Sequence, residues 1–177
     1  MPARALSRIL RAMTSDSRKD AGKVRVLMVC LGNICRSPTA EAMLRKHVRE
    51  AGLGDVIEVD SAGTADYHVD SPPDRRAIAH GERRGLAMKQ LRGRQVGKVD
   101  FERFDHILAM DEDNLENLLR LRPEGSRAQV GLLMDYAPDA GSREVPDPYY
   151  GDGADFERVL DLVDAASAGL VEALRPR

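Results

Sequence analysis

Residues 30–37 read Cys-Leu-Gly-Asn-Ile-Cys-Arg-Ser, between an apolar run, made of Val24 and residues 26–29, and a helical pattern that starts at Pro38. An apolar run followed by a short loop and a helix predicts the first unit of an α/β domain. A loop that enters a helix points unpaired backbone N–H groups at one spot, and the helix dipole adds positive potential there. The stretch therefore predicts a phosphate-binding loop after the first strand.

Two side chains give this loop its chemistry. Helix N-termini and nearby cations favour the thiolate form of cysteine, which is the nucleophile, so Cys30 is a candidate for attack on phosphorus. The planar guanidinium of Arg36 can hold two oxygens of one phosphoryl group. Gly32 lets the loop curl, and Ser37 is placed either to cap the helix or to donate its hydroxyl to the thiolate. The pattern indicates phosphoryl transfer through sulfur.

A second motif lies far downstream. Thiolate chemistry needs an acid to protonate the departing oxygen and a base to activate water afterwards. Residues 145–151 read Val-Pro-Asp-Pro-Tyr-Tyr-Gly, with Asp147 between two prolines. Because proline fixes φ and restricts the residue before it, this carboxylate stands on a stiffened loop. Asp147 is therefore the candidate acid.

Together the strings Cys-Leu-Gly-Asn-Ile-Cys-Arg-Ser-Pro and Asp-Pro-Tyr-Tyr-Gly resemble the low-molecular-weight protein tyrosine phosphatase family, and the resemblance covers nearly all of residues 24–174. It implies a four-stranded parallel sheet flanked by helices on both faces. It also implies phosphotyrosine hydrolysis through a phosphocysteine, with Cys30 as nucleophile, Arg36 on the phosphoryl group and Asp147 as acid. The substrate-binding residues that it implies are Leu31, Gly32, Asn33, Ile34, Cys35, Ser37, Tyr67, Tyr149 and Tyr150.

The resemblance also implies supporting residues, and it contains one departure. Ser61 is similar to the residue that hydrogen-bonds the loop asparagine, here Asn33, and Asp111 resembles a supporting residue beside the loop. The family usually shows His-x-Ala-Arg-Gln where residues 91–95 read Leu-Arg-Gly-Arg-Gln. Leu91 thus replaces the expected imidazole. We therefore expect Asn33 to be held differently, in a looser site with lower turnover.

Composition limits the classes of function. The 177 residues, 42% of them hydrophobic, suffice for one sizeable core. The 27 basic and 29 acidic residues nearly cancel, which disfavours nucleic acid or anionic lipid as a partner. No apolar run approaches the ~20 residues of a membrane span. Only two cysteines occur, both in the loop, which fits a reducing cytoplasm.

We expect no cofactor and no metal, because the four histidines lack ligand spacing. They are interpreted as surface or helix-face residues: His47, His68, His80 and His106. We expect a monomer in which residues 1–23 are a mobile or partly helical extension, or a docking arm, and residues 24–177 are the phosphatase domain. Strands are expected at 24–29, 56–59, 106–110 and 131–134, and helices at 38–51, 74–84, 111–121 and 156–174.

Three other functions stay open at this point. Arsenate reductases of this fold need further cysteines, and none follows Cys35. Similar arginine phosphatases carry Thr at the position of Ile34 and lack the pair Tyr149 and Tyr150, so these residues favour a flat aromatic substrate. A non-catalytic phosphotyrosine-binding protein is the third alternative, given Leu91.

Two further expectations concern partner and regulation. The partner is a phosphotyrosyl protein, and resemblance to bacterial members suggests an autophosphorylating tyrosine kinase. Under peroxide, Cys35 is placed to form a reversible disulfide with Cys30 and so to protect it from irreversible oxidation.

Overall fold

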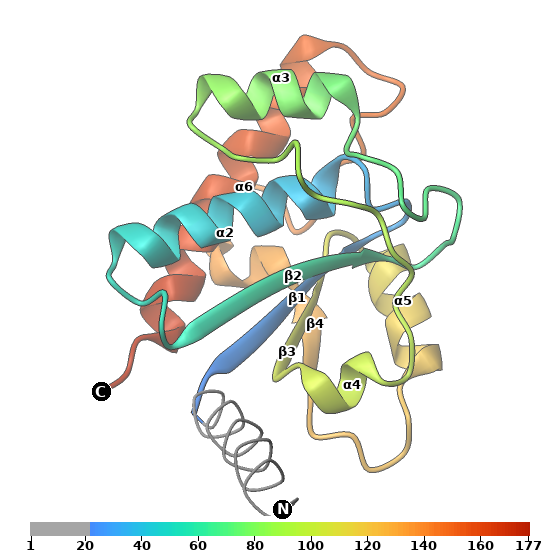
Figure 1. Ribbon diagram of the computed structural model, residues 1–177, viewed down its shortest axis with the longest axis vertical. Coiled ribbons are helices and arrows are strands. Elements are labelled where there is room, and N and C mark those ends of the chain that lie inside the picture. The colour runs from blue at the N-terminus through green and yellow to red at the C-terminus, as the bar shows by residue number, and fades with distance from the viewer. Residues whose placement is uncertain (1–21) are drawn as a thin grey trace, which may run out of the picture.

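The computed structural model describes residues 22–177, so almost all of the expected extension, residues 1–23, lies outside the described residues. The chain forms a parallel sheet with helices on both faces, as the sequence predicted (Figure 1). The strand order is β2-β1-β3-β4, and every neighbouring pair is parallel. The strands are β1 (Val24–Cys30), β2 (Ile57–Gly63), β3 (His106–Ala109) and β4 (Gln129–Leu132).

Two groups of helices cover the sheet. Helices α2 (Arg36–Glu50) and α6 (Gly153–Leu174) cover one face, and α3 (Arg75–Arg83) packs on α6. Helices α4 (Asp100–Arg103) and α5 (Glu112–Leu121) lie on the other face (Figure 1).

The sheet separates two hydrophobic cores, and strand β1 contributes side chains to both. Val26 and Met28 are buried in the core beneath α2 and α6, whereas Leu27 and Val29 are buried in the core beneath α4 and α5. Burial on both faces explains why residues 26–29 of this strand are continuously apolar instead of alternating. Because parallel strands end at one edge, β1 delivers Cys30 beside Gly63, the last residue of β2.

Three elements differ from the expectation. Strand β2 ends at Gly63, four residues after the expected end at residue 59. The fourth strand lies at Gln129–Leu132, and Leu133 and Met134 instead begin the 3₁₀ turn η1 (Leu133–Tyr136). Their apolar character reflects burial against α6 and not pairing with β3, whose ladder ends at Leu132. The short helix α4 was not predicted, since four residues are too few to show a helical period.

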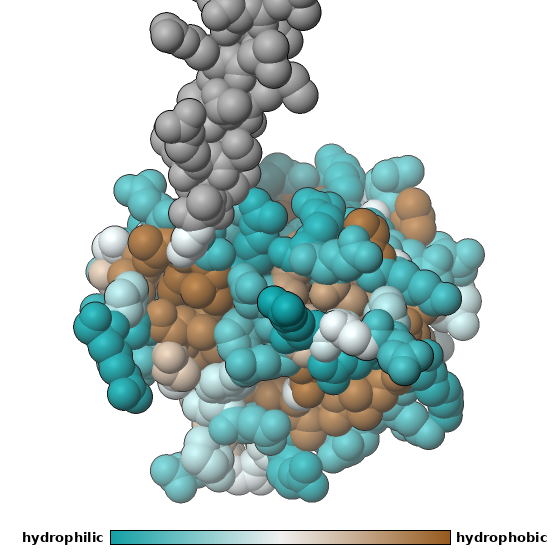
Figure 2. Space-filling model, turned by 90° about the horizontal axis from the view of Figure 1, so that it is seen from below, coloured by the Kyte–Doolittle hydropathy of each residue, from teal (hydrophilic) through white to brown (hydrophobic). Residues whose placement is uncertain are grey.

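The surface away from the site is mixed in character. Figure 2 shows the face at which β1 begins, where hydrophilic side chains surround smaller apolar areas. Within residues 22–177, no helix combines the length and the apolar character needed to cross a membrane.

Candidate active site

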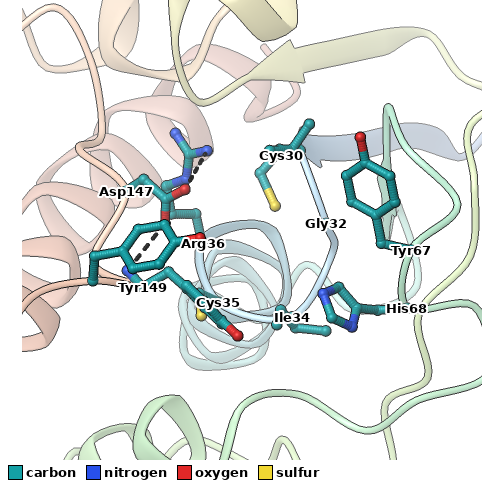
Figure 3. A pocket seen from close by; sticks show the side chains of 11 residues that line it. Cys30, Gly32, Ile34, Cys35, Arg36, Tyr67, His68, Asp147 and Tyr149 are labelled. Atoms are coloured by element: carbon teal, nitrogen blue, oxygen red, sulfur yellow. Dashed lines mark hydrogen bonds and ion pairs between the residues drawn. The ribbon is translucent and has the colours of Figure 1, made fainter.

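A cavity of about 290 Å³ opens at the carboxyl end of β1 (Figure 3). Ten of the residues predicted from the sequence line it: Cys30, Leu31, Gly32, Ile34, Cys35, Arg36, Tyr67, Asp147, Tyr149 and Tyr150. The predicted residues Asn33 and Ser37 are buried and do not line the cavity. The structure therefore brings the loop, the acid motif and the predicted tyrosines together around one cavity.

The sulfur of Cys30 lies among hydrogen-bonding groups. Its Sγ accepts the backbone N–H of Asn33 at 3.3 Å and lies 3.0 Å from the hydroxyl oxygen of Ser37. Of the two expected uses of Ser37, the helix cap is wrong. Helix α2 begins at Arg36 with Cys35 as N-cap and no side-chain capping bond. The Ser37 hydroxyl is instead placed to stabilise a negative charge on Cys30.

The phosphate loop turns its carbonyl groups toward neighbouring segments. The carbonyl of Leu31 accepts the N–H of Ala65 at 3.0 Å, and that of Ile34 accepts the N–H of Asp74 at 2.8 Å. In a trans peptide the N–H points opposite to the carbonyl. The N–H groups that follow these two carbonyls therefore point away from those segments and are available to an anion.

Arg36 is a buried cation with carboxylates on both sides. Only 3% of it is exposed, and its Nη1 donates to Asp111 at 2.5 Å and to the carbonyl of Val145 at 3.1 Å. Its Nη2 lies 3.7 Å from the carboxylate of Asp147. Burial alone lowers the pKa of Arg36, but Cys30 and then Asp111 outweigh it and raise that pKa. Arg36 therefore stays charged at the base of the cavity.

The Nε of Arg36 is a buried donor without a hydrogen-bond partner among residues 22–177. An unpaired buried donor is costly, so such a group commonly serves a ligand. A phosphoryl oxygen would satisfy it.

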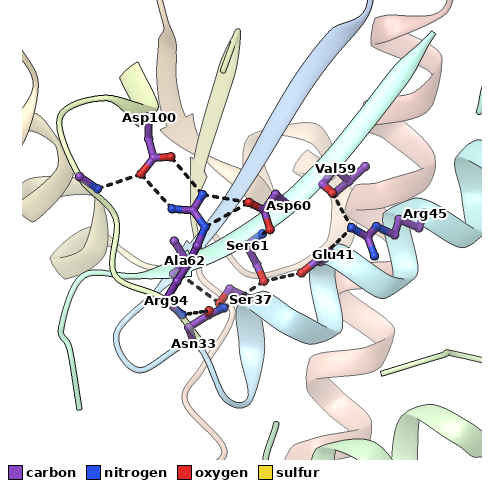
Figure 4. A network of polar contacts seen from close by, with 11 residues as sticks. Asn33, Ser37, Glu41, Arg45, Val59, Asp60, Ser61, Ala62, Arg94 and Asp100 are labelled. Carbon is purple, nitrogen blue, oxygen red and sulfur yellow. Dashed lines mark hydrogen bonds and ion pairs between the residues drawn. The ribbon is translucent and has the colours of Figure 1, made fainter. Parts of the chain in front are cut away.

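Asn33 is held by three groups other than the imidazole that the family shows (Figure 4). Its amide nitrogen donates to Ser37 at 2.8 Å and to Ser61 at 3.0 Å, which confirms the expected contact with Ser61. Its amide oxygen accepts the backbone N–H of Arg94 at 3.1 Å. Leu91, in place of the imidazole, packs against the core. These bonds hold Asn33 at φ 56°, a left-handed conformation that asparagine tolerates.

Charged groups anchor both ends of this network. The guanidinium of Arg94 pairs with Asp60 at 2.9 Å and with Asp100 at 3.0 Å. At the other end Ser61 donates to Glu41, which also pairs with Arg45 at 2.7 Å (Figure 4). Burial raises the pKa of Glu41, although the bond from Ser61 and the charge of Arg45 oppose this. The loop therefore rests on a connected polar support.

The cavity rim contains one residue that the sequence did not predict. His68 lies half-buried in a loop and lines the cavity against Gly32, so its interpretation as a surface residue missed its place in the site. The sequence contained one signal for this position, because His68 directly follows the predicted substrate-binding residue Tyr67. Tyr67 is 71% exposed and Tyr150 is 95% exposed, so both are accessible to a protein partner at the mouth.

Gly93 provides a prediction about the segment that carries His68. A Cβ at residue 93 would overlap the carbonyl oxygen of His68, and Gly93 exchanges two backbone hydrogen bonds of 2.8 Å with Asp70 and Ser71. Gly93→Ala, although alanine is the family's usual residue, is expected to destabilise the protein by about 1–3 kcal/mol. Urea unfolding measures the change. Gly97→Ala, with no atom near its Cβ, is the control, and equal stability of both variants would contradict the prediction.

Cys35 gives a prediction about oxidation. Both cysteines are buried free thiols, and burial, followed by the charges of Asp74 and Cys30, raises the pKa of Cys35. If Cys35 forms a disulfide with an oxidised Cys30, the Cys35→Ser protein will lose more activity to peroxide. After a peroxide pulse and thiol reduction, it will regain a smaller fraction of its untreated activity than the unchanged protein does. Equal fractional recovery in both proteins would show that Cys35 gives no protection.

Comparisons with known proteins agree with this geometry. Residues 25–177 match the family model described as low molecular weight phosphotyrosine protein phosphatase. A protein of that name from Schizosaccharomyces pombe is 46% identical over 143 residues, which cover 80% of this chain and 91% of the relative.

Solved structures share the fold. A protein tyrosine phosphatase from Entamoeba histolytica superposes with a TM-score of 0.82 at 39% identity, covering 86% of this chain and 97% of that one. The drosophila arginine phosphatase superposes with a TM-score of 0.80 at 30% identity, covering 85% of this chain and 98% of that one. From its sequence and its fold, this chain belongs to the low molecular weight phosphotyrosine protein phosphatase family.

Proposed function

We propose that this protein is a protein tyrosine phosphatase in which Cys30, Arg36 and Asp147 carry the reaction. The observation that carries the proposal is their convergence on one cavity: a sulfur within hydrogen-bond distance of Ser37, a buried guanidinium, and a carboxylate 3.7 Å from that guanidinium. Nucleophile, anion-binding cation and proton donor are the groups that phosphate ester cleavage through a covalent intermediate requires.

In the first step, the thiolate of Cys30 attacks phosphorus in line with the departing phenolic oxygen. The S–P bond forms as the P–O bond breaks, and Asp147 transfers its proton to the leaving oxygen. The loop N–H groups and Arg36 hold the phosphoryl oxygens and stabilise their charge in the transition state.

In the second step, the ionised carboxylate of Asp147 takes a proton from water, whose oxygen attacks phosphorus. The S–P bond breaks, inorganic phosphate forms, and Cys30 leaves as a thiolate. The Ser37 hydroxyl and the Asn33 N–H stabilise this thiolate by hydrogen bonds.

The walls of the cavity favour an aromatic ester. Ile34, Tyr67 and Tyr149 give it apolar and aromatic sides, which suit the flat ring of phosphotyrosine. The fold alone does not distinguish this substrate from phosphoarginine, because the drosophila arginine phosphatase shares it. The discrimination rests on Ile34 and on the tyrosine pair at 149 and 150.

The direct test is phosphate release from phosphotyrosyl, phosphoseryl and phosphoarginyl peptides of one sequence, measured side by side. Release from the phosphotyrosyl peptide alone supports the proposal. Preferred release from the phosphoarginyl peptide would assign the protein to the arginine phosphatases. Tight phosphotyrosine binding without release would make it a phosphotyrosine reader and Leu91→His the next variant to build.

The variant Asp147→Asn tests whether Asp147 is the general acid. An amide keeps the shape of the side chain but supplies no acidic proton, so kcat/KM for phenyl phosphate is expected to fall roughly 10²–10⁴-fold. The fall should be smaller for 2,4-dinitrophenyl phosphate, because that leaving oxygen is weakly basic and needs little proton transfer. Equal falls for both esters would assign Asp147 a role other than general acid.

We further propose that the substrate is a phosphotyrosyl protein, with an autophosphorylating bacterial tyrosine kinase as the first candidate. Two free cysteines among residues 22–177 support a reducing cytoplasm as the location. We propose a monomer, which sedimentation equilibrium of the full chain would test.

A further inference from the structure

Arg76 in α3 is fixed relative to the phosphate loop. Its guanidinium makes two hydrogen bonds with Asp74, from Nε at 3.1 Å and from Nη2 at 2.9 Å, and its backbone N–H donates to the same carboxylate. The backbone N–H of Asp74 in turn donates to the carbonyl of Ile34 at 2.8 Å. Asp74 therefore connects Arg76 directly to the loop that binds phosphate.

On its other side, Arg76 contacts the loop that carries Asp147. Its Nη2 donates to the carbonyl of Tyr149 at 3.0 Å, and its guanidinium lies 5.5 Å from the ring centroid of Tyr149 and 4.8 Å from that of Phe156. The backbone N–H of Tyr149 donates to the carboxylate of Asp147 at 3.1 Å. Arg76 thus connects the phosphate loop, residues 30–37, with the loop that carries Asp147 and with the start of α6. The loop that carries Asp147, residues 145–152, is called the acid loop below.

The acid loop has few other attachments. At its start the N–H of Val145 donates to the carbonyl of Met110 and the Val145 carbonyl accepts Nη1 of Arg36, and at its end α6 begins at Gly153. Between these points, within the described part of the chain, the bond from Arg76 is the one hydrogen bond from the loop to another segment. The Asp147 carboxylate itself is 45% exposed. Without Arg76, the loop would keep its ends and the 3.7 Å ion pair between Asp147 and Arg36, but it would lose this hydrogen bond beside the acid.

We propose that Arg76 is a positioning residue that holds the acid loop against the phosphate loop and so keeps Asp147 within reach of the leaving oxygen. This inference rests on the proposed role of Asp147 as general acid. A planar fork is needed, because one guanidinium must satisfy the Asp74 carboxylate and the Tyr149 carbonyl together, which an ammonium does less well.

The proposal predicts a dependence on the leaving group. Loss of Arg76 lowers the fraction of time that Asp147 is in position, and only steps that need its proton are slowed. A displacement of about 1 Å in a positioned group can cost up to about 10²-fold in rate. We expect Arg76→Met to lower kcat/KM for phenyl phosphate about 10-fold and that for 2,4-dinitrophenyl phosphate less than about 2-fold. Arg76→Lys should fall between Arg76→Met and the unchanged protein.

Arg84, the C-cap residue of α3, offers a matched control at the other end of the same helix. It pairs with Glu157 at 2.5 Å and with Asp161 at 2.8 Å, both in α6, and none of its ion pairs within residues 22–177 reaches the acid loop. Arg84→Met therefore removes an arginine between α3 and α6 without touching Tyr149. Its ratio of kcat/KM values for the two esters should equal that of the unchanged protein.

The ratio separates the possible outcomes. The inference would be overturned if Arg76→Met lowered kcat/KM equally for both esters or lowered neither. It would also be overturned if Arg84→Met changed the ratio of the two kcat/KM values as much as Arg76→Met does. If Asp147→Asn shifts the ratio and Arg76→Met does not, the positioning role fails while the acid role stands. If Asp147→Asn leaves the ratio unchanged, both fail. The double variant Arg76→Met with Asp147→Asn should show the ratio of Asp147→Asn alone, because the two residues act through one proton.

Discussion

In the Cys30→Ser protein we expect phosphate release from phosphotyrosine to fall by at least about 10⁴-fold, as removal of a covalent nucleophile does in other enzymes. The Ser37 hydroxyl and the Asn33 N–H lie 3.0 and 3.3 Å from the sulfur and stabilise it as an anion. A serine hydroxyl is far less acidic than a thiol and stays protonated in the same surroundings. The substitution therefore removes the nucleophile and leaves the anion site in place.

Two measurements separate loss of chemistry from loss of structure. Inorganic phosphate should still bind to Cys30→Ser in calorimetry, because Arg36 and the loop N–H groups remain. Acid quenching during turnover of a radiolabelled substrate should trap label on Cys35→Ser, which keeps the Cys30 thiol, and none on Cys30→Ser. Turnover of Cys30→Ser within about 10-fold of the unchanged protein would refute the nucleophile assignment.

The parts of the site that follow directly in the chain could be predicted from the sequence. Residues 30–37 are a contiguous strand–loop–helix connection, so the apolar run before them and the helical pattern after them determine where Cys30 and Arg36 lie. The place of Asp147 in the same site was predictable from the family resemblance, because the two prolines alone indicate no more than a stiffened turn. The parallel sheet could be predicted from the alternation of apolar runs and helical patterns, whereas its strand order was not predicted.

Residues whose function depends on distant contacts could not be predicted in this way. Arg94 supports Asn33 from 61 positions away, and Arg76 reaches Tyr149 across 73 positions, yet neither contact can be read from the sequence. Leu133 and Met134 have the composition of a strand, but burial against α6 determines their conformation. In each case tertiary packing, and not local propensity, decides the outcome.

The second large effect is expected for Arg36→Lys, which should lower kcat/KM for phosphotyrosine roughly 10³-fold, by analogy with arginines that stabilise phosphoryl transfer. Nη1 of Arg36 is already engaged by Asp111 and the carbonyl of Val145, while Nε has no hydrogen-bond partner among residues 22–177. The guanidinium can therefore be held from one side and present donors to two phosphoryl oxygens from another. A lysine keeps the charge but has one compact ammonium group, which cannot serve both sides.

Asp111→Asn is the matched control for Arg36→Lys, since it keeps the guanidinium and weakens only the carboxylate contact that orients it. We expect a smaller loss for Asp111→Asn than for Arg36→Lys. Arg36→Lys should lower kcat more than it raises the inhibition constant of inorganic phosphate, because a fork that holds two equatorial oxygens gains most in the transition state. A loss in Arg36→Lys below about 10-fold, or one confined to phosphate affinity, would mean that charge alone, and not guanidinium geometry, accounts for what Arg36 contributes.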